Sequence, residues 1–439
     1  MLIVMVGALG ACTADVEPIS EPDLGATGGA RTGGARGFIG TGGSTAPGTG
    51  GILMVGSGGT TTASGGATTA TGATTGTGGL PASGGATQGG RPPGTGGISV
   101  GPTGGSVGNP AVCSFASGLN VAWVKFAGDV PNPSMAAFQT LFKSTHDAGG
   151  RVIRWWLHTN GTVTPGYDAA GMAMPLSQAA IKGVTDVLGW AHTAGVAIDL
   201  SLWSFDMLQG GENISTTLRN NNRNLLMVDA NRQAYIDNVL TPLVKAVKGN
   251  PGLYSWEIFN EPEGMTAQNG WTGSQGGVTV DESFIQRTVN WFAAAIRAVD
   301  PTALITNGSW TFKACSTGVT GMTNYYSDSA LRMAGGKQSG TLDFYEVHYY
   351  TLNGSQYSPF LNPATHWGLD KKVLMGEFYA QPTEGVATND IYTKLYSTGY
   401  NGAWAWQYND GGPATKWPSM QAPMQAVSTA HPAEVGSCP

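Results

Sequence analysis

Short apolar segments alternate with helical patterns along most of this chain, and this alternation limits the possible fold more than any other feature. Eight segments have the composition of strands: 119–123, 152–157, 196–203, 253–260, 303–306, 342–348, 373–377 and 403–408. Helical periodicity occurs between them at 134–148, 178–194, 229–248 and 283–299. Repeated strand–helix units favour a parallel sheet with helices packed on it. Eight such units predict an α/β fold, a (β/α)8 TIM barrel.

An open, doubly wound sheet is the alternative to a closed barrel. That fold usually carries a Gly-rich nucleotide-binding loop after its first strand, and no such loop follows residues 119–123. The connections after the fifth and sixth strands are weak as helices. A long polar segment at 209–224 also separates the third strand from the next helix.

The region before the predicted barrel has a different composition. Residues 13–110 are rich in Gly, Thr, Ala and Ser, and from residue 24 onward their only charges are Arg31, Arg36 and Arg91. Such a segment buries too little apolar surface to offset its ordering entropy. We therefore expect a disordered Gly/Thr-rich linker at 13–110 and a folded catalytic domain at 111–439. A Gly-rich β-solenoid is the alternative, but the Gly-Thr-Gly-Gly repeats are irregularly spaced.

Residues 1–12 form an apolar segment that ends in Leu9-Gly-Ala-Cys12. This segment resembles a bacterial lipoprotein signal, which implies lipid attachment at Cys12 and a secreted or cell-surface lipoprotein, in the outer membrane or extracellular. Two features depart from that pattern: no Lys or Arg precedes the apolar run, and the run is short. An ordinary apolar N-terminus is the alternative.

The charge and the cysteines restrict the possible partners. The formal net charge is −6, which argues against nucleic acid as a partner. Cys113 and Cys438 bracket the folded part and could form a disulfide, because the first and last strands of a barrel are neighbours. Cys315 is expected to be a free, partly buried thiol. No Cys or His cluster has zinc-site spacing, so no metal is predicted.

Two glutamates follow apolar, β-prone segments. Glu261 comes directly after Leu253–Asn260, and Glu377 ends the segment 373–377. The carboxyl ends of barrel strands are where barrel enzymes place their reacting groups. A pair of carboxylates at these positions predicts glycoside hydrolysis.

Several motifs together resemble the clan A retaining glycoside hydrolases, and most of all glycoside hydrolase family 5. The motifs are Arg154 on strand two, Asn260-Glu261-Pro262 on strand four, His348-Tyr-Tyr350 on strand six, Glu377 on strand seven and Trp406 on strand eight. The resemblance covers most of 117–410. It implies that Glu261 is the acid/base and Glu377 the nucleophile. It also implies the ~5–5.5 Å carboxyl separation of retaining enzymes.

The resemblance assigns roles to neighbouring residues as well. It implies that Arg154 keeps Glu377 ionised, that Asn260 binds the sugar 2-hydroxyl, that Tyr350 contacts the nucleophile and that Trp406 stacks below the reacting sugar. His348 is expected to line the same face as Tyr350. His158, placed on a loop after strand two, and Trp203 and Trp310 at strand ends are candidate sugar contacts, with packing as the alternative. We expect Glu257, Glu263 and Glu346 to be supports, and Asp206 and Asp410 to be rim residues.

The aromatic residues at strand ends suggest a long cleft for a plant-type β-linked polysaccharide. Local similarity favours an endo-β-1,4-mannanase, with an endo-β-1,4-glucanase as the close alternative. A non-catalytic surface carbohydrate-binding protein would usually lack one of the two glutamates. A third alternative makes the linker the functional part, as an adhesive or spacer. No cofactor is implied, because carboxylates suffice for this chemistry, and we expect a monomer.

Overall fold

The computed structural model describes residues 113–211, 214–409 and 417–438. The expected lipoprotein-like segment with Cys12, the expected linker and the expected rim residue Asp410 lie outside the described residues. The described part begins just before the first strand of the predicted barrel.

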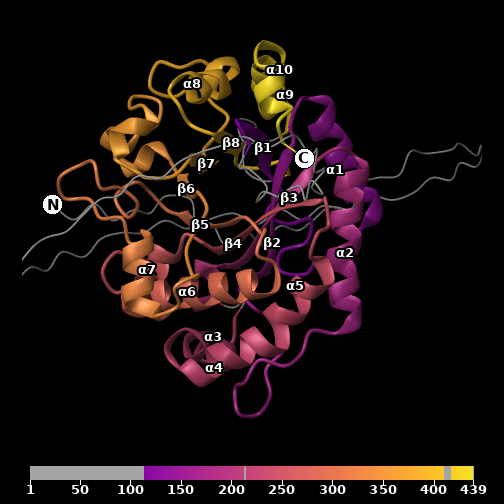
Figure 1. The fold of residues 1–439 in the computed structure, drawn as a ribbon, viewed down its shortest axis with the longest axis vertical. Coiled ribbons are helices and arrows are strands. Elements are labelled where there is room, and N and C mark those ends of the chain that lie inside the picture. The colour runs from indigo at the N-terminus through magenta and orange to yellow at the C-terminus, as the bar shows by residue number, and fades with distance from the viewer. Residues whose placement is uncertain (1–112, 212–213, 410–416, 439) are drawn as a thin grey trace, which may run out of the picture. The chain divides into compact units, whose positions relative to one another are not determined.

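Eight parallel strands close into a barrel in which each strand pairs with its neighbours in chain order and β8 pairs with β1 (Figure 1). The strands are β1 Ala116–Asn120, β2 Val152–Thr159, β3 Ala197–Ser204, β4 Leu253–Asn260, β5 Ile305–Ser309, β6 Tyr345–His348, β7 Val373–Glu377 and β8 Gly402–Ala405. The predicted (β/α)8 barrel is therefore confirmed, and the open sheet is excluded. The pairing of β8 with β1 also places residues more than 200 positions apart on neighbouring strands, such as Ala116 and Gly402.

The first strand begins earlier than its apolar pattern predicts, at Ala116 rather than at residue 119. The first residues of this strand include Ser117 and Gly118, which give no hydrophobic signal. Gly118 is required there because a Cβ at this position would collide with the backbone oxygen of Val152 on β2. Close contact between neighbouring strands thus selected a residue that weakens the sequence pattern.

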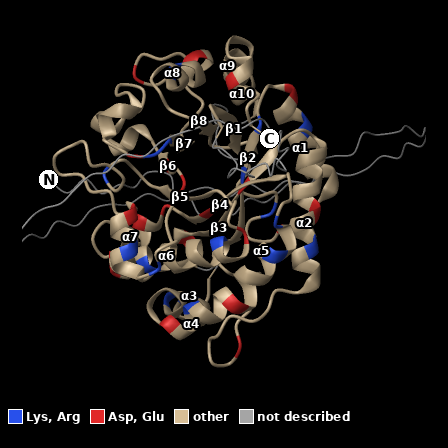
Figure 2. Cartoon of the chain, viewed as in Figure 1, with Lys and Arg blue, Asp and Glu red and all other residues tan. Residues whose placement is uncertain are grey.

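Helices surround the barrel, and charged residues lie both on these helices and on the segments that connect them to the strands (Figure 2). The helices are α1 Met135–Asp147, α2 Gln178–Thr193, α3 Thr216–Met227, α4 Asp229–Tyr235, α5 Thr241–Val247, α6 Glu282–Val299, α7 Asp328–Gly335, α8 Ile391–Ser397, α9 Trp417–Ala430 and α10 Pro432–Val435. A π-helical turn, Ile236–Leu240, joins α4 to α5. The weak crossover after β6 contains only short 3₁₀ turns among the described residues.

Helix α3 was not predicted, because the segment 209–224 is polar and rich in Asn. Ser215 caps the helix by accepting a hydrogen bond from the amide of Leu218. Asn222 is fully buried and donates from Nδ2 to the backbone oxygens of Asn160 and Met207. A buried amide that satisfies two loop carbonyls stabilises this region in place of an apolar side chain.

The barrel interior changes character along its axis. One end is filled by a buried apolar cluster whose members lie in, or directly before, each of the eight strands: Ala116, Val152, Ala197, Tyr254, Leu304, Phe344, Leu374 and Trp404, with the flanking Cys113 and Cys438. Toward the carboxyl ends of the strands the interior becomes polar and holds Arg154 and several buried acids. The apolar end is the usual packed core of a barrel, and the polar end is where its chemistry is expected.

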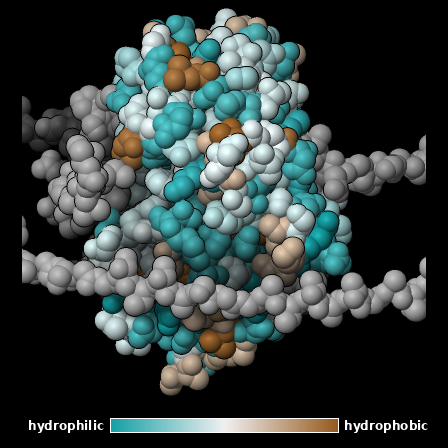
Figure 3. All heavy atoms as spheres, turned by 90° about the vertical axis from the view of Figure 1, so that its left-hand side faces the viewer, coloured by the Kyte–Doolittle hydropathy of each residue, from teal (hydrophilic) through white to brown (hydrophobic). Residues whose placement is uncertain are grey.

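Cys113 and Cys438 form a disulfide across 325 positions of sequence, with Cα atoms 5.0 Å apart, as predicted. Cys315 is a free and fully buried thiol. On the described residues of the face in Figure 3, hydrophobic side chains form separate spots among hydrophilic ones. None of the helices in the described ranges is long and apolar enough to cross a membrane.

Replacing both bridging cysteines by serine is expected to lower the free energy of unfolding by about 3 kcal/mol. The disulfide closes a very long loop, so it removes much conformational freedom from the unfolded chain. Denaturant melts of the wild type and of the double variant Cys113→Ser, Cys438→Ser measure this difference. Cys315→Ser, which breaks no bridge, is the matched control, and equal stability of all three proteins would contradict the expectation.

Candidate active site

Two glutamates lie at the carboxyl end of the barrel, on strands β4 and β7. Glu377 is the last residue of β7 and is almost completely buried. Glu261 follows β4 with a left-handed backbone conformation, φ 45°, which is costly for a residue other than glycine. One carboxylate oxygen of Glu261, one of Glu377 and one ring nitrogen of His348 lie within 4.8 Å of one another. The two carboxylates therefore face each other across a short gap.

Arg154 holds this end of the barrel together from β2. Its guanidinium donates two hydrogen bonds to Glu257, from Nε (2.8 Å) and from Nη2 (2.7 Å). It also donates to Oε1 of Glu377 (2.5 Å), to Oδ1 of Asn260 (2.8 Å) and to Oδ1 of Asn120 (2.9 Å). The predicted pair of Arg154 and Glu377 is thus present. All five N–H groups of the guanidinium are used.

Glu377 receives a second hydrogen bond, from the hydroxyl of Tyr350 to Oε2 at 2.7 Å. Burial raises the pKa of Glu377, to about 7, while Arg154 and Tyr350 both act to lower it. Both contacts favour the ionised carboxylate, which is the form that can act as a nucleophile.

Glu261 has a different environment. Burial raises the pKa of Glu261 well above its usual range, and the charges of Glu377 and Glu263 raise it further. Arg154 opposes this shift but donates no hydrogen bond to Glu261. The side chain of Glu261 meets Nδ1 of His348 at 2.9 Å. Of the two carboxyls, Glu261 therefore holds its proton more strongly and Glu377, bound by Arg154 and Tyr350, ionises more readily, so the pair can supply an acid and a nucleophile.

Asn260 lies beside Glu261 and is fixed by two contacts. Its Oδ1 accepts from Arg154, and its Nδ2 donates to the hydroxyl of Ser204 at 3.1 Å. An amide nitrogen has two hydrogens, so one remains for a ligand. This geometry is compatible with the expected contact to a sugar hydroxyl.

Aromatic side chains flank the carboxylates. Trp406 follows β8, is half-buried and packs against Trp123 and Trp156, with ring centroids 5.9 and 5.6 Å away. Trp310 follows β5, is half-buried and lies 5.3 Å from Trp271. Both remain candidates for stacking on sugar rings.

The expected roles of His158 and Trp203 are not supported. His158 is in β2 rather than on a loop, because this strand continues to Thr159. It is fully buried, and its ring nitrogens contact Thr164 and Tyr235, each at 2.9 Å. Burial lowers the pKa of His158 to about 3. Trp203, which is 1% exposed, packs on this imidazole at 4.8 Å, so both residues are part of the core.

Two further residues differ from expectation. Asp206 is not a simple rim residue, because it accepts a 2.5 Å hydrogen bond from Ser204, and burial raises the pKa of its carboxyl. Asn120 was not singled out in the sequence, yet it accepts from Arg154 and donates to the backbone oxygen of Gly376 at 2.8 Å. The available signal was a polar residue at the end of an otherwise small and apolar strand.

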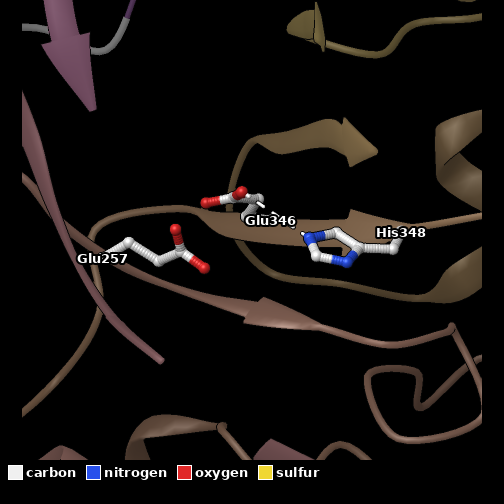
Figure 4. Close-up of side chains that lie close together, drawn as sticks. All are labelled: Glu257, Glu346 and His348. Atoms are coloured by element: carbon white, nitrogen blue, oxygen red, sulfur yellow. Dashed lines mark ion pairs between the residues drawn. The ribbon is translucent and has the colours of Figure 1, made fainter. Parts of the chain in front are cut away.

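Two of the acids that were expected to be supports, Glu257 and Glu263, are hydrogen-bonded within the described residues. Glu263 accepts from the amide of Trp310 (3.0 Å) and the hydroxyl of Tyr326 (2.8 Å), which joins the loops after β4 and β5. Burial raises the pKa of Glu263 to about 7. Glu257 is bound to Arg154. Glu346 points into the same region, close to His348 (Figure 4).

One carboxylate oxygen of Glu257, one of Glu346 and one ring nitrogen of His348 lie within 4.8 Å of one another, which is close enough for a shared cation. However, Nε of Arg154 lies 2.8 Å from Glu257 and 2.9 Å from Glu346. The guanidinium already supplies the positive charge at this position, so these residues do not fit a metal ion.

Comparisons with known proteins agree with this geometry. The sequence profile of the cellulase family (glycosyl hydrolase family 5) matches residues 116–412. A mannan endo-1,4-beta-mannosidase of Mytilus edulis is 36% identical over 321 residues, which cover 67% of this chain and 84% of the relative. A second one, of Cryptopygus antarcticus, is 33% identical over 326 residues, covering 68% and 81%. The solved beta-mannanase of Mytilus edulis superposes with a TM-score of 0.64 at 32% identity, over 72% of this chain and 92% of that structure.

Proposed function

Because the chain belongs to glycosyl hydrolase family 5, we propose that this glycoside hydrolase is an endo-β-1,4-mannanase that retains the anomeric configuration. The observation that carries the reaction type is the close pair of carboxyls, Glu261 and Glu377, of which only Glu377 accepts hydrogen bonds from Arg154 and Tyr350 that favour its ionised form. The preference for mannan over glucan is supported by two relatives named mannan endo-1,4-beta-mannosidase.

In the proposed reaction, Glu377 attacks the anomeric carbon while Glu261 gives its proton to the leaving oxygen. A covalent glycosyl-enzyme forms, and Glu261 then acts as the base that activates water for its hydrolysis. Arg154 and Tyr350 hold Glu377 ionised and aimed. Asn260 donates its remaining amide hydrogen to the sugar 2-hydroxyl, a contact that can tighten in the transition state.

Retention of configuration follows from the spacing of the two carboxyls. Inverting enzymes separate their carboxyls by about 6.5–9.5 Å to admit a water molecule, whereas retaining enzymes use about 5–5.5 Å. Carboxylate oxygens of Glu261 and Glu377 within 4.8 Å of each other support the shorter class. A proton NMR time course on a β-linked manno-oligosaccharide should show the β-anomer first, and early α-anomer would contradict the proposed roles.

The substrate class is tested by reducing-sugar release. Galactomannan, glucomannan, carboxymethylcellulose, lichenan and xylan are incubated with the wild type, with Glu377→Gln as the blank. Mannanase activity predicts release from galactomannan and glucomannan and none from carboxymethylcellulose. Release mainly from carboxymethylcellulose would identify an endo-glucanase, and binding without release would favour a carbohydrate-binding protein.

We also propose that the catalytic domain, 111–439, is carried on a Gly/Thr-rich linker, 13–110, behind a lipid-modified Cys12. A substrate that is an extracellular polymer supports a location outside the cell or on its surface. Mass spectrometry of the mature N-terminus tests this: a diacylglyceryl group on Cys12 is expected, and Cys12→Ser should release the enzyme into the medium. An unmodified Cys12 in the exported protein would exclude the anchor.

Replacing Tyr350 by Phe is expected to move the acidic limb of the pH–rate profile upward by about 1 pH unit. The Tyr350 hydroxyl lowers the pKa of Glu377, and a hydrogen bond to a charged group contributes roughly 1.5–3 kcal/mol. Without it the pKa rises, so the nucleophile becomes protonated at a higher pH as the pH falls. Measuring kcat/KM against pH for both proteins tests this, and Tyr357→Phe, at a partly buried tyrosine, is the control.

A further inference from the structure

Glu346 on β6 is a fully buried carboxyl for which the described residues provide no hydrogen-bond donor. Neither of its oxygens has a hydrogen-bond partner. The nearest positive group is Nε of Arg154, 2.9 Å from Oε1, but the single hydrogen of Nε is directed at Glu257. The other four N–H groups of Arg154 bind Glu257, Glu377, Asn120 and Asn260. An ionised carboxylate buried without a donor is very costly.

The charged and titratable groups around Glu346 also favour its neutral form. The groups that face it, from β2, β3, β4, β6 and β7, are Arg154, Asp199, Tyr254, Glu257, His348 and Glu377. Only one of them carries a positive charge at neutral pH, and three others are acids. Burial raises the pKa of Glu346 well above its usual range, and the charges of Glu257 and Asp199 raise it further. Glu346 therefore carries a proton that it can donate.

His348 supplies the matching acceptor. Burial and the charge of Arg154 lower the pKa of His348 well below its usual value, so the imidazole is neutral and carries one N–H. Nδ1 contacts Oε1 of Glu261 at 2.9 Å, whereas Nε2 has no hydrogen-bond partner. Nε2 lies 3.8 Å from Oε1 of Glu346, and the imidazole edge faces that carboxyl (Figure 4). A hydrogen bond here requires the carboxyl to move closer to Nε2, and no other hydrogen bond holds either of its oxygens.

We propose that Glu346 is a neutral carboxylic acid that donates to Nε2 of His348 and so keeps the imidazole proton on Nδ1, where it is donated to Oε1 of Glu261. The consequence, which rests on the proposed role of Glu261 as the acid, concerns the position of its proton. With Oε1 occupied by the imidazole N–H, the carboxyl proton of Glu261 is carried on Oε2, free for the leaving group. In the other tautomer, Nδ1 would accept that proton, and the acid would be turned away from the substrate. Glu346 is thus a positioning residue that acts through His348.

The tautomer of His348 can be measured without substrate. Nitrogen-15 spectra of histidine-labelled protein distinguish a protonated ring nitrogen from an unprotonated one, and His348→Gln identifies the signal among the six histidines. The proposal predicts the Nδ1–H tautomer in the wild type and in Glu346→Gln, whose amide can also donate to Nε2. It predicts the Nε2–H tautomer in Glu346→Met, which has no donor. An Nε2–H tautomer in the wild type would overturn the proposal whether or not the enzyme cleaves mannan.

Kinetics provide the second readout. Glu346→Met should lower kcat on the order of 10-fold or more, part of the ~10²–10⁴-fold that acid–base catalysis contributes. The basic limb of the pH–rate profile of Glu346→Met should move to higher pH, because a proton of Glu261 that is held by Nδ1 of His348 is harder to remove. Glu346→Gln should preserve both the rate and the profile. If Glu346 were ionised, the Gln variant would instead remove a negative charge near Glu377 and move the acidic limb to lower pH, which contradicts the proposal.

A matched control is available at Glu384. This partly buried carboxylate accepts hydrogen bonds from the hydroxyls of Tyr349 (2.5 Å) and Ser358 and has no hydrogen bond to His348 or Arg154 among the described residues. Glu384→Gln should leave the tautomer and both limbs unchanged. A tautomer change in this variant would show that the signal reports general disturbance of the barrel end, and the assignment to Glu346 would be withdrawn. If Glu346→Met does not fold, the wild-type and Glu346→Gln spectra still decide.

Discussion

Glu377→Gln is expected to lower kcat/KM on mannan on the order of 10⁴-fold or more, because removing a covalent nucleophile removes the reaction path itself. The amide keeps the shape of the side chain and can still meet Arg154 and Tyr350, whose contacts with Glu377 are 2.5 and 2.7 Å long. Initial rates at several substrate concentrations measure the effect.

The fold of this variant should remain intact. Burial raises the pKa of Glu377, so replacing the carboxylate by a neutral amide removes a charge that is costly to bury. The thermal midpoint should stay within about 4 °C of the wild type, equivalent to roughly 1 kcal/mol. Asp390→Asn, on an exposed carboxylate in the turn before α8, is the control and should keep full activity. Substantial turnover by folded Glu377→Gln would refute its role as nucleophile.

Arg154→Lys is expected to damage both activity and stability, even though it conserves the positive charge. A lysine ammonium has three donors and cannot reproduce the planar set of five that binds Glu257, Glu377, Asn120 and Asn260. Breaking buried charge pairs costs about 3–5 kcal/mol, so the free energy of unfolding should fall by about 3 kcal/mol. We expect kcat/KM to fall on the order of 10³-fold, as the nucleophile loses its alignment.

The pH–rate profile of Arg154→Lys tests whether Arg154 lowers the pKa of Glu377. The charge of Arg154 lowers the pKa of Glu377, so weakening that contact raises the pKa, and activity is then lost at a higher pH as the pH falls. Arg297→Lys is the control, because Arg297 pairs with Asp343 at 2.7 Å on a partly exposed face far in sequence from the carboxyl pair. An unshifted acidic limb in Arg154→Lys would contradict the proposed influence of Arg154 on Glu377.

The barrel and its carboxylate pair could be predicted from sequence because their signals are local. Each buried strand is a short apolar run, and Glu261 and Glu377 stand directly where two of these runs end. Since all parallel strands end at one edge of a closed barrel, two residues 116 positions apart must lie near each other. Helix α3 was missed for a related reason: its buried side is stabilised by Asn222, whose partners cannot be read from the surrounding residues.

His158 and Trp203 show where local patterns fail. A histidine after an apolar run and a tryptophan at a strand end suggest side chains that line an open cleft. Both are instead buried, and they contact each other and Tyr235, the last residue of α4. Glu346 was expected only to be a support, and nothing around it in the sequence indicates that every donor of Arg154 is already used.

The sequence alone determined the barrel and the position of the two glutamates at the carboxyl ends of its strands, because these features follow from strand length and strand order. It left the disulfide as a possibility, and the contact of Arg154 with Glu377 was implied by the family resemblance. Only the tertiary structure decided which side chains reach the cleft, which acids are supplied with donors, and which carboxyl keeps its proton. Desolvation and hydrogen-bond satisfaction depend on residues brought together from β1, β2, β4, β6 and β7, and no local segment of sequence contains that information.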